Sequence, residues 1–158
     1  MKVETAKETD IMNENIEELN KALSNLVQLD IDAVHAYGHA VKEIEDPIIK
    51  ERLLKFQDDH RKHISGLSEE IRKLGKQPPE ESMDFKGYVI EAFAAVRSFT
   101  GLKGALKSMK TTEEITNRYY SEVVSWQAPD TVKELLRSYF SEEKIHLDYI
   151  TANLKVLD

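Results

Sequence analysis

Two histidines lie at helical spacing in an apolar segment of the chain. The segment LLKFQDDHRKHISGL holds five residues that follow one another at steps of 3, 4, 3 and 4 residues: Leu53, Phe56, His60, His63 and Leu67. This spacing places all five on the face of a helix that packs against other helices. An imidazole on such a face is either a hydrogen-bonded core group or a ligand in a site that needs it. Polar residues at the same level of the other helices favour the second interpretation.

Three other apolar patterns each pass through polar residues near their midpoint. Asp30 stands in the middle of one pattern, Glu113 in the middle of a second, and Glu143 with His146 in the middle of a third. Helices of this length span about 40 Å, and antiparallel packing puts their midpoints at one level. We therefore expect one buried polar layer built from six residues: Asp30, His60, His63, Glu113, Glu143 and His146.

The predicted layer needs something that neutralises its three carboxylates. Each buried ion costs several kcal/mol, and no lysine or arginine stands on the apolar faces near these positions. Either the acids are protonated and hydrogen-bonded to the imidazoles, or a metal ion is bound. Carboxylates combined with imidazoles suit iron, manganese or zinc. We expect Tyr37 and Tyr120 to be core aromatics whose hydroxyls support the site.

Four amphipathic stretches position this layer. The apolar spacing predicts helices over 15–45, 47–74, 102–127 and 130–156. Asn15 and Glu18 resemble a capping box at the start of the first helix, and Asp46 with Pro47 ends it and begins the second. Short turns join helices one to two and three to four, whereas the connection after Gly75 is long. We therefore predict an all-α fold, an antiparallel four-helix bundle.

The long connection contains a further amphipathic segment. Over about 83–100, four apolar residues share one face: Phe85, Val89, Phe93 and Val96. We expect an extra short helix here, in the crossover between helices two and three. Its aromatic face is expected to pack on the end of the bundle or on a second subunit. On this basis we predict a homodimer.

The third helix leaves one ambiguity. The run Thr111-Thr112-Glu113-Glu114 can also cap a helix start, which would break the helix at this point. If the helix is rotated instead, Glu114 takes the place of Glu113 in the polar layer.

Several polar residues near the layer have simpler explanations. Asp32, His35 and His39 share another face of the first helix, where a solvated surface or a subunit contact is expected rather than a second metal site. Asp59 lies off the apolar face of the second helix and is expected to face solvent, although its spacing also allows a pair with His63.

The composition limits the classes of function. The 158 residues suit one domain, and we expect a flexible tail over 1–14 and a single helical domain over 15–158. With 22 basic and 29 acidic residues the net charge is −7, so no nucleic-acid partner is expected. The chain has no cysteine, which excludes disulfides and thiolate metal sites. It has no long apolar run and no apolar signal region, so we expect a cytoplasmic protein with no membrane partner.

The two halves of the predicted bundle repeat the same intervals. A tyrosine follows an acid by seven residues in helices one and three, and a histidine follows an aromatic residue by seven in helices two and four: Asp30–Tyr37, Glu113–Tyr120, Phe56–His63 and Tyr139–His146. The motif His60-x-x-His63 then corresponds to Glu143-x-x-His146. A repeated site suits two metal ions better than one.

This pattern resembles the ferritin-like superfamily, close to rubrerythrin-type and small bacterial ferritin-like domains. The resemblance covers about 16–74 and 102–156 and rests on Asp30 with Tyr37, His63, Glu113 with Tyr120, and Glu143-Lys144-Ile145-His146. The family site takes one carboxylate from each of two helices and Glu-x-x-His from each of the other two. The resemblance implies a di-metal site that binds iron, with manganese or zinc as alternatives. It also implies ferroxidase or peroxide-reducing activity, with oxygen or peroxide as the partner.

The chain departs from the family pattern at two positions. His60 stands where the second helix of the family has a glutamate, and Asp30 is shorter than the usual glutamate of the first helix. The layer therefore has three carboxylates where the family has four. We expect metal binding to survive this change better than redox chemistry does. The alternative function is a non-enzymatic helical module in stress response or assembly, with a structural metal or none.

Overall fold

The chain folds into four long helices. The computed structural model describes residues 2–80 and 100–158. The helices in this part of the chain are α1 (Lys2–Ala40), α2 (Pro47–Lys73), α4 (Gly101–Val123) and α5 (Asp130–Leu157). The predicted all-α fold is therefore confirmed, and no described helix combines the length and apolarity needed to cross a membrane.

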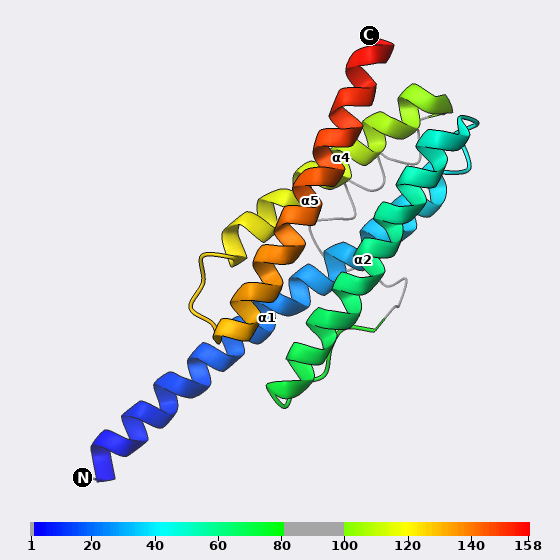
Figure 1. The fold of residues 1–158 in the computed structure, drawn as a ribbon. Helices are drawn as coiled ribbons and strands as arrows, with labels where there is room; N and C mark the ends of the chain where they lie inside the picture. The colour runs from blue at the N-terminus through cyan, green and yellow to red at the C-terminus, as the bar shows by residue number, and fades with distance from the viewer. Residues whose placement is uncertain (1, 81–99) are drawn as a thin grey trace.

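The four helices pack as an antiparallel bundle, as the sequence predicts. α1 contacts α2 and α4, and α5 contacts α4 and α2, so each helix lies beside two others (Figure 1). Helices in contact run in opposite directions, whereas α2 and α4 run the same way. The end of α2 and the start of α4 consequently lie at opposite ends of the bundle. The extra crossover helix predicted between them falls almost wholly in 81–99, outside the described residues, and the homodimer inferred from its aromatic face stays a prediction.

The turn between α1 and α2 was predicted in part. The Asp46 carboxylate accepts hydrogen bonds from the backbone N–H groups of Ile48 and Ile49, at 2.9 and 3.1 Å, and Pro47 opens α2. This cap is confirmed. The end of the first helix is not: α1 stops at Ala40, five residues early, although Ile44 remains in the core as predicted.

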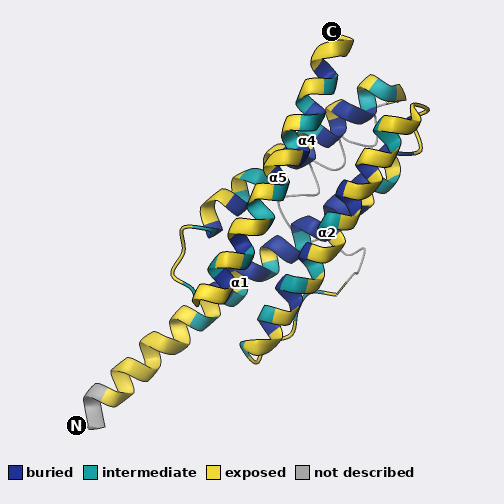
Figure 2. Cartoon of the chain, viewed as in Figure 1, coloured by how far each residue is buried: buried dark blue, intermediate teal, exposed yellow. Residues whose placement is uncertain are grey.

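The predicted start of the first helix near Asn15 is wrong, because α1 already begins at Lys2. No glycine or proline interrupts 2–15, and lysine, glutamate and alanine favour a helix. Figure 2 shows α1 projecting from the bundle, with residues 5–15 exposed on every side. The division into a tail over 1–14 and a domain over 15–158 stays a prediction.

α4 runs unbroken through the run of two threonines. Their hydroxyls donate hydrogen bonds to backbone carbonyls one turn earlier, from Thr111 to Lys107 and from Thr112 to Ser108, each at 3.2 Å. A hydroxyl bonded in this way continues a helix instead of capping one. The possible break in the third helix is therefore absent.

The predicted apolar faces form a core in two parts. One cluster includes Tyr37, Leu53, Leu106 and Ile150, and the other includes Leu23, Leu67, Tyr120 and Leu136. Each cluster takes residues from all four helices, and the predicted polar layer lies at mid-height, between residues of the two clusters along each helix. The apolar faces thus hold the four helices in the register that brings the polar residues together.

Candidate metal centre

The six residues of the predicted layer lie together in the interior. His146 is 1% exposed, and the other five are 0% exposed: Asp30, His60, His63, Glu113 and Glu143. They come from all four helices, which confirms the predicted juxtaposition. Two groups within this layer have donor atoms close enough to hold a metal ion.

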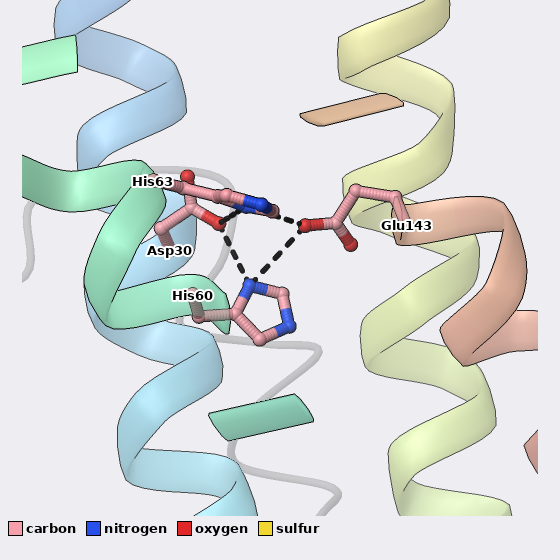
Figure 3. A group of neighbouring side chains, drawn as sticks. All are labelled: Asp30, His60, His63 and Glu143. Atoms are coloured by element: carbon pink, nitrogen blue, oxygen red, sulfur yellow. Dashed lines mark hydrogen bonds and ion pairs between the residues drawn. The ribbon is translucent and has the colours of Figure 1, made fainter. Parts of the chain in front are cut away.

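The first group consists of Asp30, His60, His63 and Glu143 (Figure 3). The His60 Nδ1 atom lies 2.7 Å from Asp30 Oδ1 and 3.3 Å from Glu143 Oε1. The His63 Nδ1 atom lies 3.4 Å from the same Asp30 oxygen and 3.0 Å from the same Glu143 oxygen. Four donor atoms from three helices therefore face one another around one point.

The second group consists of His60, Glu113, Glu143 and His146. Here His60 contributes its other nitrogen, Nε2, which lies 3.2 Å from Glu113 Oε1. The His146 Nδ1 atom lies 3.5 Å from Glu113 Oε1 and 3.7 Å from Glu143 Oε2. His60 and Glu143 thus belong to both groups, each through two different atoms.

Two tyrosine hydroxyls hold the acids of the opposite helix. Tyr120 on α4 donates a hydrogen bond of 2.7 Å to Asp30 Oδ2 on α1, and Tyr37 on α1 donates to Glu113 Oε1 on α4. Burial first, and then the adjacent carboxylates, raise the pKa of both tyrosines well above the usual value. Both hydroxyls therefore keep their protons and act as donors, in the supporting role expected for them.

Two further carboxylates bind the outer nitrogens of the histidines. Asp59 Oδ2 on α2 lies 3.1 Å from His146 Nε2 on α5, and Glu142 Oε2 on α5 lies 2.8 Å from His63 Nε2 on α2. The Asp59 and Glu142 side chains are 23% and 37% exposed, so they link the layer to the surface. The expectation that Asp59 faces solvent holds only in part, because its carboxylate contacts both Lys62 on the surface of α2 and His146 on α5. Glu142 was not predicted, although it precedes Glu143 just as Asp59 precedes His60.

Aromatic rings cover two of the imidazoles. Tyr139 on α5 stacks on His63 on α2 with ring centroids 4.1 Å apart, and Phe56 on α2 lies 4.2 Å from His146 on α5. Gly66 makes room for the first stack, because a Cβ atom there would overlap the Tyr139 hydroxyl. The rings fix the imidazole planes and keep water away from them.

Asn117 ties the second group to the backbone. Its side-chain amide donates to the backbone carbonyls of Glu113 and Glu143, at 2.8 and 2.9 Å. It therefore crosslinks α4 and α5 at the level of the two acids. Sequence reasoning missed this residue, because a polar residue one turn from Glu113 carries no signal of its partner.

The histidines and acids polarise one another. Burial alone lowers the pKa of a histidine, but the carboxylates of Asp30 and Glu143 outweigh it and raise the pKa of His63 to about 9. For His146 the carboxylates of Asp59 and Glu113 likewise overcome burial and raise its pKa to about 10. Without a metal, both rings are therefore protonated at neutral pH.

The pKa values of two of the acids, Asp30 and Glu113, are lowered, whereas that of Glu143 is raised. Burial raises the pKa of a carboxyl group, yet the imidazoles of His60 and His63 hold the pKa of Asp30 below its ordinary value, and His146 and His60 do the same for Glu113. Glu143 keeps a raised pKa because of its burial. Glu143 is thus the acid that gains most from a neighbouring cation.

Several buried oxygen and nitrogen atoms of the layer make no hydrogen bond. Among the described residues these include Glu113 Oε2, both carboxylate oxygens of Glu143 and Nδ1 of His146. Burying a polar atom without a hydrogen bond is costly. Glu143 Oε1 and His146 Nδ1 do face oppositely charged neighbours, at 3.0 and 3.5 Å, and all four atoms are of types that bind metal ions. The layer therefore fits a divalent transition metal by its donor types and by its unsatisfied atoms.

The alternative ligands named from the sequence lie elsewhere. Glu114 is exposed and its carboxylate lies 3.4 Å from Lys110 Nζ, so it does not replace Glu113. Asp32 is buried, whereas His35 and His39 are exposed. In residues 2–80 and 100–158 the two groups described above are those with metal-binding geometry, and Asp32, His35 and His39 belong to neither.

Comparison with known proteins supports the fold and names a family. No curated protein matches the chain. Among solved structures, "Hypothetical Protein Pfu-1136390-001 From Pyrococcus furiosus" is similar, with a TM-score of 0.66 at 16% sequence identity over 88% of this chain and 89% of the other. Identity this low speaks for the shared fold alone. Residues 18–125 match the family described as "Domain of unknown function (DUF2383)", and because the match spans more than half of the 158 residues, the protein belongs to that family.

Proposed function

We propose that the protein binds two divalent transition-metal ions in its buried layer, in the manner of ferritin-like proteins. The observation that carries the proposal is the pair of four-residue groups that share His60 and Glu143. The oxygens of Glu113 and Glu143 that make no hydrogen bond support it, since a metal ion would satisfy them. Iron and manganese accept this mixture of carboxylate and imidazole, and zinc is the alternative.

With ferrous iron as the substrate, the supported reaction is its oxidation. Two ferrous ions give one electron each to hydrogen peroxide, which takes up two protons and leaves as two water molecules. If oxygen is the oxidant, the same two electrons and two protons convert it to hydrogen peroxide. The 158 residues contain no cysteine for an iron–sulfur or rubredoxin-type centre.

The surrounding side chains have definite tasks in this reaction. Tyr37 and Tyr120 hold Glu113 and Asp30 in place with their hydroxyl protons. Asp59 and Glu142 contact the outer Nε2 atoms of His146 and His63 and so orient the two rings with Nδ1 toward the proposed metal ions.

Ferrous oxidation can be tested against a matched pair of variants. The protein is loaded anaerobically with ferrous iron and mixed with peroxide or oxygen while the ferric absorbance is recorded. Glu113→Gln removes a buried ligand, whereas Glu114→Gln makes the same change on the exposed face of the same helix. Wild type and Glu114→Gln should oxidise iron much faster than Glu113→Gln. Oxidation by the wild type no faster than in buffer alone contradicts the proposal.

A second candidate, a non-enzymatic helical module, is favoured by one observation. Without a metal, neighbouring carboxylates hold the pKa of His60, His63 and His146 above the usual value even though burial opposes it. The Nδ1 atoms of His60 and His63 also lie at hydrogen-bond distance from Asp30 Oδ1, at 2.7 and 3.4 Å. Imidazolium and carboxylate groups then neutralise each other in part. Bound metal without ferrous oxidation supports this module with a structural metal, and no bound metal supports the metal-free form.

A further inference from the structure

The layer has an internal two-fold correspondence that is broken at one place. Three kinds of contact occur twice with the helices exchanged: tyrosine to acid, aromatic ring to histidine, and outer carboxylate to histidine. The pairs are Tyr37–Glu113 with Tyr120–Asp30, Phe56–His146 with Tyr139–His63, and Asp59–His146 with Glu142–His63. The same correspondence matches His60 with Glu143. This is where it is broken, because one half has an imidazole at this position and the other half has a carboxylate.

The two ring nitrogens of His60 face different groups. Nδ1 lies 2.7 Å from Asp30 Oδ1, in the first group, and Nε2 lies 3.2 Å from Glu113 Oε1, in the second. Glu143 is divided in the same way, since Oε1 lies near His63 and Oε2 near His146. Both central residues therefore present one donor atom to each side.

The His60 ring is held in this orientation. It is 0% exposed, and its centroid lies 5.4 Å from that of Tyr37 and 5.1 Å from that of His146. A half-turn of the ring would replace the nitrogens facing Asp30 and Glu113 with carbon atoms and would lose both polar contacts. The placement of a nitrogen on each side is thus a property of the packed layer.

The spacing of the donors is close to that around metal ions. Donor atoms of a four-coordinate ion with bonds of about 2.0–2.2 Å lie about 3.3–3.6 Å from one another. The nitrogen–oxygen separations given above run from 2.7 to 3.4 Å in the first group and from 3.2 to 3.7 Å in the second. These contacts are near the spacing of a coordination shell that includes one His60 nitrogen, and all ligand atoms of each group lie within 4.8 Å of one another.

We propose that His60 bridges the two metal ions through Nδ1 and Nε2, opposite the bridge that Glu143 makes through its two oxygens. This inference rests on the proposed function, because it assumes that two ions bind. A ring that binds metal at both nitrogens has given up both N–H protons to solvent, and it then carries one negative charge. The charge equals that of a carboxylate, so an imidazole at position 60 preserves the charge balance of a two-carboxylate bridge.

The bridge has a geometric consequence. The lone pairs of the two ring nitrogens diverge, so ions bound to them lie farther apart than the about 3.5–4 Å of pairs bridged by carboxylates alone. The chain therefore holds a wider metal pair than a centre bridged by two glutamates.

Three matched histidine variants test the bridge in solution. Co²⁺ is titrated into the metal-free wild type and into His60→Gln, His63→Gln and His146→Gln, and the visible absorption of bound Co²⁺ is recorded. His63→Gln should weaken one binding step and His146→Gln the other, each at least about tenfold. His60→Gln should weaken both steps at least about tenfold. Thermal unfolding of each metal-free variant shows that it is folded.

A second variant keeps the test decisive if His60→Gln folds poorly. His60→Glu supplies a carboxylate bridge and should retain both binding steps. Crystals of Mn²⁺-loaded wild type should show two anomalous peaks on opposite sides of the His60 ring, more than about 4 Å apart, and His60→Glu should bring them to about 3.5–4 Å.

The outcomes separate this inference from the proposed function. Two bound ions of which only one depends on His60, or two peaks with the ring beside only one, overturn the bridge and leave the di-metal site standing. A wild type that binds no Co²⁺ or Mn²⁺ overturns both.

Discussion

Tyr139 of α5 lies stacked on the His63 imidazole of α2, with ring centroids 4.1 Å apart and ring planes 27° apart. The stack depends on the absence of a side chain at Gly66, one turn after His63 on α2. The Tyr139 hydroxyl also donates a hydrogen bond of 3.3 Å to the backbone carbonyl of Lys62. Gly66 therefore costs helix stability but leaves the space that the covering ring occupies.

Gly66→Ala should displace Tyr139 and loosen His63. Overpacking of this kind costs about 1–3 kcal/mol, which urea unfolding of the metal-free protein can measure. Gly38→Ala is the matched control, since its Cβ would meet only the amide end of Gln57, at 3.3 Å, and alanine gains about 1 kcal/mol in helix propensity. Equal stability of the two variants contradicts the packing role of Gly66.

The outer carboxylates should tune metal affinity. Asp59→Asn and Glu142→Gln remove the groups that orient His146 and His63, and each should weaken metal binding about 10–100-fold. Asp58→Asn is the control, because Asp58 is exposed and pairs with Arg61 on the same helix surface. Competition titration with a chelator measures all three. A loss in Asp58→Asn as large as in Asp59→Asn shows that surface charge alone is responsible.

Metal affinity should rise with pH. With pKa values of about 9 for His63 and about 10 for His146, both rings carry a proton that an incoming ion must displace at neutral pH. Each displaced proton raises the apparent affinity about tenfold per pH unit below the pKa. Titrations at several pH values between about 6 and 8 measure the slope. An affinity independent of pH in this range contradicts the protonated state of the metal-free layer.

The stability of the metal-free protein should fall in the alkaline range. A histidine whose pKa is raised on folding contributes stability that is complete below its unfolded value of 6.5 and is lost as the pH rises through the folded values, about 9 for His63 and about 10 for His146. Asp59 acts in the opposite direction. The His146 contact lowers its pKa from 3.8 to about 2, so its contribution is present above 3.8 and lost as the pH falls through 2.

Thermal unfolding across the pH range checks these two limbs. The melting temperature should be highest between the two windows and decline above pH 6.5. His63→Gln should flatten the alkaline limb, and bound metal should do the same by replacing the protons. A melting temperature that increases from neutral to alkaline pH contradicts the predicted decline.

The sequence predicts the buried layer well because each apolar face is a local property of one helix. The positions of Asp30, His60, Glu113 and Glu143 follow from counting along each face, and antiparallel packing then aligns the midpoints. The residues at the intervals repeated in the two halves of the chain also make equivalent contacts. Each contact occurs twice, once with each helix in the role that its counterpart has in the other half.

The partners across helices could not be predicted. Asp59 and Glu142 lie off the apolar faces, and only the distance between α2 and α5 shows that they reach the histidines opposite. The start of α1 was missed for a related reason, because a polar segment has no apolar period even where its residues favour a helix. Asn117 could not be predicted either, since its hydrogen-bond acceptors are backbone carbonyls of two different helices.

The central claim is that the buried layer binds two metal ions per chain, and metal analysis tests it most directly. The purified protein is loaded anaerobically with ferrous iron or Mn²⁺, freed of excess metal and measured by elemental analysis beside Glu143→Ala and the surface control Lys144→Ala. We predict about two ions per chain in the wild type and in Lys144→Ala, and a marked loss in Glu143→Ala, whose side chain belongs to both groups. A wild type that retains no metal after loading contradicts the account.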